Sequence, residues 1–372
     1  MKKAIENRLA RLRKSLSEKK IDTFMVLVEE NRRYLSGFTG EDGQFDESAG
    51  ALFITDQKLV LATDSRYELQ AKNEASLYEI YCYREGLDKS LPEILRALDT
   101  KALGFESIRL SFLQYQKIYE QLKSDKQQIQ LVETENMVED LRVIKEETEI
   151  KAIMQALAIA ESVFTDFSTR ICPGMTEKEA AWEMEKGMRE AGAEALAFPT
   201  IVASGPNSAL PHAIPGERRI AEGEPILFDW GAKLNGYCSD ISRMIVIGQA
   251  DENFKKIYNT VLHAQQKAID AIRPGMSSKR VDEVARNHID DMGYKGKFGH
   301  GLGHGVGIAV HERPRISPLK DTKLEAGMVF TVEPGIYIPE WGGIRIENMV
   351  VVRENGAEVL NQLGTDIEDF CI

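Results

Sequence analysis

A repeat occupies the chain from residue 150 onward. The segment CPGMT at 172–176 recurs as RPGMS at 273–277, so that Pro173 and Pro274 are 101 residues apart. Pro-Gly ends a helix and the Thr or Ser that follows can cap the next one, so each segment predicts a turn between two helices. We expect these helices at 150–171, 177–191, 254–272 and 278–292. Two halves with the same order of elements predict a pseudo-two-fold axis.

Each half closes with a predicted β-hairpin that carries two acidic residues. Asp229 and Glu333 each stand six residues after a glycine, and Asp240 and Glu347 lie where the hairpins return. Matched positions around a pseudo-two-fold axis should bring the four carboxylates together. An acid within an apolar strand is costly unless it is paired or bound to metal. A single such acid more often forms a structural salt bridge, but four at matched positions favour a shared site.

Three of the six histidines, His300, His304 and His311, fall in the segment FGHGLGHGVGIAVHERP. Every second residue from Gly299 to Gly307 is glycine. In an extended chain one face would then carry no side chains and allow close backbone approach, while His300 and His304 would share the other face. The spacing does not fit GxGxxG, which argues against a dinucleotide site.

Carboxylates combined with histidine form a hard-ligand set that suits Mn²⁺, Mg²⁺ or Fe²⁺ better than Zn²⁺ alone. Four carboxylates balance two divalent cations, and two cations about 3.5–4 Å apart can turn a bridging water into hydroxide near neutral pH. The set therefore predicts a hydrolase that acts on an amide or an ester. His212 and His311 are candidates for hydrogen bonding or proton transfer to the substrate, although His212 alone fits a plain loop histidine equally well. His263 and His288 lie in predicted helices and are interpreted as structural.

The chain before the repeat is expected to form a separate α/β domain over residues 1–139, with the second domain at 140–372. Strands are expected at 51–55, 58–63 and 129–132, and helices at 91–98 and 112–122. We find no catalytic cluster of acids and histidines in its sequence. Its expected role is to shape access to the site rather than to do chemistry.

Composition narrows the possible partners. With 47 Lys and Arg against 59 Asp and Glu, the formal net charge is −12, which argues against nonspecific binding to nucleic acid. No stretch approaches the roughly 18–20 apolar residues of a membrane span, and the basic start MKKAIENRLARLRKSL lacks the apolar core of a secretory signal. The four cysteines are far apart and form no CxxC pair, so neither a zinc knuckle nor a disulfide framework is predicted. These features favour a cytoplasmic protein.

The acid and histidine motifs resemble those of the pita-bread metallopeptidases, which include methionine aminopeptidase, aminopeptidase P and prolidase. The resemblance covers about 150–372 and implies an α+β pita-bread domain with an internal pseudo-two-fold repeat. The five metal ligands that it implies are Asp229 in FDWG, Asp240 in YCSDISR, His304 in HGVG, Glu333 in TVEPGIY and Glu347 in RIEN.

The same resemblance implies roles for these residues. Asp240 and Glu347 would bridge two divalent ions, most often Mn²⁺, with Co²⁺, Fe²⁺ or Zn²⁺ as alternatives. His311 would stabilise the tetrahedral intermediate and His212 would contact the scissile region of the substrate. Glu333 is a candidate proton shuttle as well as a ligand.

Two further residues, His300 and Arg345, stand at positions that resemble those of the proline-specific branch of this family. The segments NRRYLSGFTG and ATDSRYELQA also resemble the amino-terminal domain of that branch, which is of the creatinase and prolidase type. Creatinase lacks the metal ligands and is therefore disfavoured. The resemblance implies a homodimeric Xaa-Pro aminopeptidase that takes peptides with proline in second position. The alternatives are a prolidase restricted to Xaa-Pro dipeptides and, from another class, a non-catalytic pita-bread binding module.

Overall fold

The computed structural model describes residues 2–43, 47–125 and 128–372. The chain forms two compact units that divide between Leu141 and Arg142, and each unit is described by itself. Among the described residues, none of the helices combines the length and the apolar character that a membrane crossing requires.

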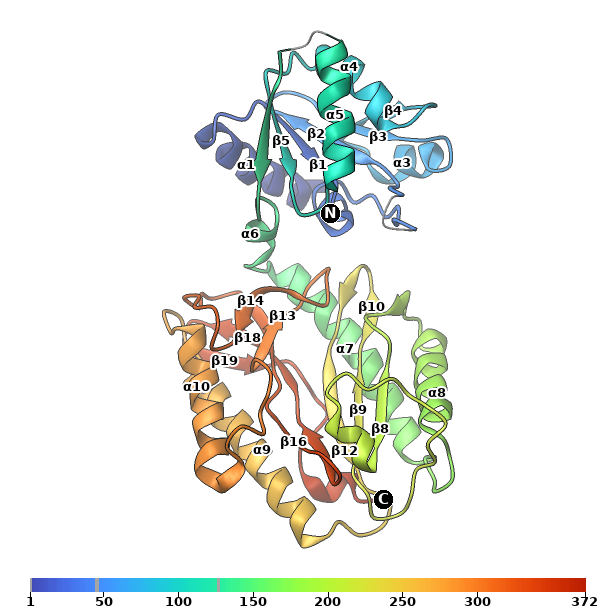
Figure 1. The fold of residues 1–372 in the computed structure, drawn as a ribbon, viewed down its shortest axis with the longest axis vertical. Coiled ribbons are helices and arrows are strands. Elements are labelled where there is room, and N and C mark those ends of the chain that lie inside the picture. Colours follow the sequence, from blue (N-terminus) through green and yellow to red (C-terminus); the bar gives the residue numbers. More distant parts are fainter. Residues whose placement is uncertain (1, 44–46, 126–127) are drawn as a thin grey trace. The chain divides into compact units, whose positions relative to one another are not determined.

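The amino-terminal unit is built on one six-stranded sheet (Figure 1). The strand order is β4-β3-β2-β1-β5-β6, in which β2 runs antiparallel to both of its neighbours and the other pairs are parallel. The strands are β1 (Thr23–Val26), β2 (Ala51–Thr55), β3 (Leu59–Thr63), β4 (Glu79–Cys82), β5 (Ala102–Glu106) and β6 (Gln130–Thr134). The apolar runs predicted as strands at 51–55 and 58–63 form the β2–β3 pair.

Helices connect and cover these strands. They are α1 (Lys2–Glu18), α2 (Glu29–Ser36), α3 (Glu68–Glu74), α4 (Leu87–Ala97), α5 (Phe112–Ser124) and α6 (Glu139–Arg142). Apolar side chains of α4 and α5, such as Leu91 and Ile118, pack with Phe53 and Phe105 of the sheet in one core. The sequence predicted both helices, and the Ser111 capping box fixes the start of α5.

The first half of the carboxyl-terminal unit places two helices before its strands. Its elements are α7 (Glu147–Ser168), α8 (Glu177–Glu190), β7 (Ala195–Leu196), β8 (Ile201–Ser204), η1 (Gly205–Ala209), β9 (Ile226–Trp230), β10 (Ala232–Leu234), β11 (Tyr237–Cys238) and β12 (Ile241–Ile245). Strands β12, β9 and β8 form one sheet, and β11, β10 and β7 form another.

The second half repeats this order of helices and strands. Its elements are α9 (Glu252–Ala271), α10 (Ser278–Ile289), η2 (Asp290–Tyr294), β13 (Gly303–Gly305), β14 (Glu312–Ile316), β15 (Val329–Val332), β16 (Gly335–Ile338), β17 (Gly342–Arg345), β18 (Asn348–Arg353), β19 (Gly356–Val359) and η3 (Ile367–Phe370). Five of the strands form a sheet of order β14-β13-β15-β18-β19, and β16 pairs with β17.

Two apolar cores, each with strand residues from both halves, pack against these helices, and α8 and the α9–α10 pair lie on opposite sides of the strands (Figure 1). In the first core, Phe164 of α7 stacks on Trp230 of β9 with ring centroids 4.4 Å apart. In the second, Val261 of α9 packs with Phe330 of β15. Side chains on a strand alternate between its two faces, and the apolar ones pack in these cores. The polar groups lie toward the ends of the hairpins.

The predicted helix starts are confirmed by their caps. Thr176 accepts a hydrogen bond from the Glu179 amide, and Ser277 accepts one from the Arg280 amide. The predicted helix 278–292 ends earlier, at Ile289. The chain there enters a wider turn that closes at Gly293, whose φ of +92° a side chain would disfavour.

Candidate active site

The four hairpin acids stand at the ends of strands. Asp229 is on β9, opposite Ser242 of β12, and Asp240 lies just before β12. Glu333 follows β15 and Glu347 lies in the connection from β17 to β18. Strand ends from both halves therefore supply the acids, as the repeat predicted.

Three of the predicted ligands form one close group in the described part of the chain. A ligand atom from each of Asp240, His304 and Glu347 lies within 4.8 Å of the others. The Nε2 atom of His304 is 3.5 Å from Oδ2 of Asp240 and 3.4 Å from Oε1 of Glu333. Asp229 and Glu333 are outside that group of three, but both raise the pKa of Asp240 through their charge.

Asp240 and Glu347 are buried, with Glu333 partly buried beside them, and this placement changes the protonation of the three acids. Burial, followed by the neighbouring charge of Glu347, raises the pKa of Asp240 well above its usual range. Burial likewise raises the pKa of Glu347, and that of Glu333 to about 8. Carboxylates in such a position need protons or a cation between them to remain buried.

The geometry of His304 adds a second reason for a cation. Its Nδ1 atom is 3.2 Å from the carbonyl oxygen of Gly305, which can only accept a hydrogen bond, so Nδ1 carries the proton. Burial lowers the pKa of His304 to about 3, so the ring is neutral. The lone pair on Nε2 thus points toward two carboxylate oxygens, an arrangement that a shared cation would stabilise.

One further acid atom lacks a partner. Oδ1 of Asp229 is buried and accepts no hydrogen bond from the described residues, whereas Oδ2 accepts one from Arg345. An orphaned carboxylate oxygen beside the other acids fits a metal ligand. The donor set as a whole, four carboxylates and one imidazole, suits hard divalent cations.

Arg345 connects the acids to a polar network. It is buried, and it donates to Asp229, to the Tyr337 hydroxyl at 2.9 Å and to Oγ of Ser242 at 3.0 Å. Ser242 in turn donates to Oε2 of Glu347 at 2.8 Å. The Arg345 guanidinium, which belongs to the second half, therefore orients Asp229 of the first half directly and Glu347 of the second half through Ser242. This is the carboxylate-orienting role considered for Arg345 from sequence.

His300 is held on the other side of the Tyr337 hydroxyl. Its Nδ1 donates to the Gly301 carbonyl oxygen at 2.8 Å, so Nε2 accepts from the Tyr337 hydroxyl at 2.8 Å. Burial lowers the pKa of His300 to about 4, which keeps the ring neutral. His300 thus belongs to the Arg345 network rather than to the close group around His304.

The other two predicted histidines border the group. The His311 ring lies against that of His304, with centroids 4.2 Å apart. His212 is exposed, and the residue before it, Pro211, accepts a hydrogen bond from Arg345 at 3.3 Å. His212 is close enough to His300 and His311 for its charge to contribute to lowering the pKa of both rings.

The glycine-rich segment brings backbones together as expected. A Cβ atom on Gly303 would lie 1.9 Å from the Thr331 carbonyl oxygen, and one on Gly305 would lie 2.2 Å from that of Arg313. The regular strand covers only Gly303–Gly305, however, so His300 lies before it. The chain before the strand is held by side chains of α10 and by the Glu333 amide, which donates to the Leu302 carbonyl oxygen at 2.8 Å.

Three contributors were missed in the sequence, namely Ser242, Thr331 and Tyr337. Thr331 donates to Oε1 of Glu333 at 3.0 Å, and the other two belong to the Arg345 network. Ser242 and Thr331 each stand two residues from a predicted ligand on the same strand or its end. Spacing by two, which places side chains on one face, was the available signal.

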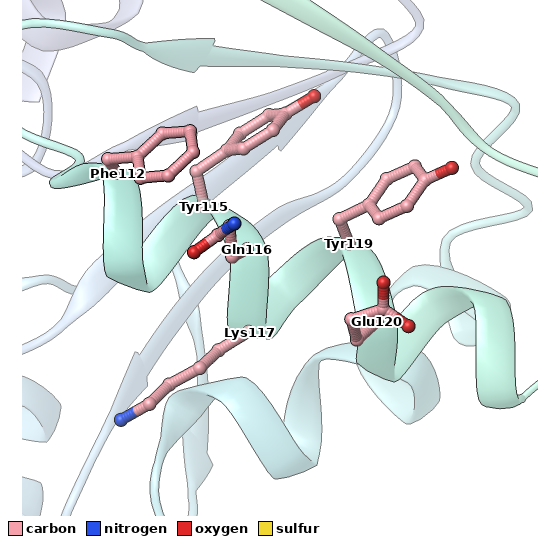
Figure 2. Close-up of a pocket in the computed structure, with 6 residues that line it drawn as sticks. All are labelled: Phe112, Tyr115, Gln116, Lys117, Tyr119 and Glu120. Carbon is pink, nitrogen blue, oxygen red and sulfur yellow. The ribbon is translucent and has the colours of Figure 1, made fainter.

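The amino-terminal unit has surface hollows that lie apart from the acids and histidines of the candidate site. The hollow beside α5 measures 780 Å³ and is lined by that helix alone, with Phe112, Tyr115 and Tyr119 projecting along it (Figure 2). Within the described residues, groups of three metal-ligating side chains are confined to the carboxyl-terminal unit. The candidate active site is therefore in that unit.

A pseudo-symmetric pair of hairpins with buried acids and a neutral histidine defines a metallohydrolase site. Residues 151–354 match metallopeptidase family M24, and residues 8–144 match the creatinase/prolidase amino-terminal domain. The chain belongs to metallopeptidase family M24, and it is a hydrolase that acts on peptides. The match confirms the predicted family and the predicted fold of both domains.

Relatives and solved structures match nearly the whole chain. An Xaa-Pro dipeptidase of Pyrococcus furiosus is 38% identical over 359 residues, which cover 96% of this chain and 98% of that protein. The structure of an Xaa-Pro dipeptidase from Bacillus anthracis is 37% identical with a TM-score of 0.91, covering 98% of this chain and 99% of that one. An X-Pro aminopeptidase from Thermotoga maritima is 38% identical with a TM-score of 0.89 and the same coverage.

Proposed function

We propose that this peptidase is a metal-dependent Xaa-Pro aminopeptidase, which hydrolyses the bond between an amino-terminal residue and proline. The observation that carries the metal dependence is the lone pair of a neutral His304 directed at two carboxylates, the buried one of Asp240 and the partly buried one of Glu333. The names of the similar proteins, dipeptidases and an aminopeptidase for Xaa-Pro bonds, support the proline selectivity.

The proposed metal ligands are Asp229, Asp240, His304, Glu333 and Glu347. Asp240 and Glu347, the most deeply buried of the acids, are proposed to bridge two ions, for which we propose Mn²⁺. Divalent ions in such a site lower the pKa of a bound water and polarise a carbonyl group.

The chain's own residues supply the remaining steps. Thr331 occupies Oε1 of Glu333, which leaves Oε2 to accept a proton from the attacking water and pass it to the leaving prolyl nitrogen. His311, whose ring lies against that of His304, would donate a hydrogen bond to the oxygen that becomes negative.

A substrate panel tests the selectivity. Xaa-Pro dipeptides, Xaa-Pro tripeptides and longer Xaa-Pro peptides are compared with the matching Xaa-Ala peptides, at equal metal loading. We expect cleavage of Xaa-Pro peptides of more than two residues at a clearly higher kcat/KM than their Xaa-Ala counterparts. Cleavage of dipeptides alone would favour the prolidase alternative, and equal cleavage of Xaa-Pro and Xaa-Ala would refute proline selectivity.

We propose the remaining features as follows. The catalytic domain spans 140–372, the amino-terminal domain at 1–139 limits access to the site, and the enzyme is a cytoplasmic homodimer. The four free cysteines support a reducing compartment. Sedimentation velocity at low micromolar concentration should give about twice the mass of one chain, 41.8 kDa.

A further inference from the structure

A buried carboxylate outside the acid cluster has gathered an unusual number of donors. Glu177, in the first turn of α8, is 1% exposed. Its Oε1 accepts from the Ser204 amide at 2.8 Å and from the Ser204 hydroxyl at 2.9 Å, and its Oε2 accepts from the Gly216 amide at 3.2 Å. The Asn207 side-chain amide donates to both oxygens, at 3.1 and 3.2 Å.

These donors flank one functional loop. Ser204 and Asn207 come before His212, and Gly216 comes after it, so one carboxylate closes the base of the loop from both sides. The loop itself is open to solvent, since Leu210 is 57% and Ile214 88% exposed. Ala213 packs with Ile201 and Ala203, but the rest of the tip is exposed, so the loop relies mainly on polar anchors for its position.

Other anchors hold the same loop from the side of the acid cluster. The Ser208 hydroxyl accepts from the Gly343 amide at 2.8 Å, and the Pro211 carbonyl oxygen accepts from Arg345 at 3.3 Å. The α8 backbone also takes part, because the Glu177 amide donates to the Arg218 carbonyl oxygen at 3.1 Å. The loop is thereby fixed between α8 and β17.

The second half has a counterpart on α10. Asp282, which is fully buried, accepts from the Leu302 amide at 3.0 Å and from Arg286. Arg286 then donates to the carbonyl oxygens of Phe298 and His300, both at 2.7 Å. In both halves, the helix after the Pro-Gly turn uses a buried acid to hold the segment that carries a site histidine.

We propose that Glu177 is a positioning residue, which acts on the reaction by fixing where His212 stands beside the substrate. The inference rests on the proposed function in so far as His212 is taken to contact the substrate. The competing explanation is that Glu177 only stabilises α8, as an acid in the first turn of a helix does.

The chain provides a matched control in the same turn. Glu179 accepts from the Thr176 amide at 2.8 Å and from the Thr176 hydroxyl at 3.0 Å, and so caps α8 itself. The substitution Glu179→Gln weakens that cap and leaves the loop donors in place. A purely helical role for Glu177 would make the two Glu→Gln variants behave alike.

The test is a double-mutant cycle between Glu177→Gln and His212→Ala. We expect Glu177→Gln to lower kcat/KM on Xaa-Pro peptides about tenfold with wild-type metal content, and Glu179→Gln to change it less than about twofold. In the His212→Ala background, Glu177→Gln should have no further effect. Equal losses with and without His212 would overturn the proposal, as would a His212→Ala variant with full activity.

Hydrogen exchange of the metal-loaded protein gives a readout that does not need activity. The Ser204 and Gly216 amides should exchange faster in Glu177→Gln, whereas Glu179→Gln should affect only the first turn of α8. Unchanged exchange at 204–216 in Glu177→Gln would overturn the proposal. Failure of the wild type to cleave Xaa-Pro peptides would instead refute the proposed function and leave the exchange result standing.

A milder variant covers the case in which Glu177→Gln does not fold. Asn207→Ala removes one donor and leaves the carboxylate with its backbone partners. It should show the same pattern in smaller measure, with loss of kcat/KM only when His212 is present. An equal loss in the His212→Ala background would again overturn the proposal.

Discussion

Both units of this protein bury acidic side chains, but the groups that surround these acids differ between the two units. In the amino-terminal unit, Glu106 at the end of β5 accepts from the backbone amides of Leu27 and Val28 and from the Asn31 side chain, each at 2.6 Å. In the carboxyl-terminal unit, Asp240 and Glu347 have the other acids as their main electrostatic neighbours. Burial raises the pKa in both places.

The difference shows what each arrangement is suited to do. An acid surrounded by donors is satisfied by the protein and holds three segments of chain together, as Glu106 holds β1, α2 and β5. Acids that surround one another repel even where the chain supplies a donor, as Ser242 does for Glu347, and a cation between them would offset that repulsion. Buried acids therefore mark a binding site when their partners are also acids.

The sharpest way to break this contrast is to remove an acid from each unit. Asp240→Ala and Glu347→Ala should each lower kcat/KM at least about a thousandfold, or roughly 4 kcal/mol, because each takes away a proposed bridge between two ions. Glu106→Gln should retain activity. The measurements are peptide hydrolysis and metal content by elemental analysis, and nearly full activity of Asp240→Ala would refute the proposed ligand set.

Much of the fold could be predicted because its signals are local. Proline, glycine and a capping hydroxyl fix the helix ends around 172–176 and 273–277 within a few residues of sequence. The matched order of elements around these turns predicted the two halves. The end of α10 was missed because a wider turn at 290–294 depends on Gly293 and its surroundings.

The site could be predicted in part for a related reason. The acids and histidines are recognisable by residue type and by their place in the repeat, whereas Tyr337 and Ser242 act through contacts with Arg345 that only the fold creates. The tautomers of His300 and His304 are likewise set by carbonyl groups of the neighbouring residues. The chemistry of a side chain can be identified in a sequence. Which residues from distant segments form hydrogen bonds with one another cannot.

Glu106, the acid surrounded by donors, should make the free energy of unfolding depend on pH. The pKa of Glu106 is raised by burial to about 7 from a usual value of 4.5. Between these values the folded chain keeps a proton that the unfolded chain releases, so the free energy of unfolding falls as pH rises, by up to roughly 3 kcal/mol. Glu106→Gln removes this pH dependence.

Urea unfolding of the wild type and of Glu106→Gln at several pH values between 4 and 8 checks this prediction. The acids of the carboxyl-terminal unit titrate in both proteins, so the difference between the two isolates Glu106. Relative to the wild type, the variant should gain stability steadily from pH 4.5 to 7. A difference that does not change with pH would contradict the raised pKa.

A smaller effect separates the selectivity of the site from its cation binding. His300 touches Tyr337 and is not among the proposed ligands. His300→Ala should therefore lower kcat/KM for Xaa-Pro peptides by about tenfold, roughly 1.4 kcal/mol, with metal content near that of the wild type. If the variant instead loses its metal, His300 supports the cation site and the proline contact lies elsewhere.

The smallest effect tests whether the pKa of Glu106 is raised mainly by burial or mainly by repulsion from another acid. Burial is the main cause of its raised pKa, but the charge of Glu139 also raises it, and Asn31 donates to both acids. Glu139→Gln removes one charge and leaves the burial, so the pKa of Glu106 should fall by less than one unit. The stability lost between pH 4.5 and 7 should then shrink by less than about 1.4 kcal/mol. If the pH dependence vanished altogether, repulsion between acids would govern the amino-terminal unit as well, and the contrast with the cation site would no longer hold.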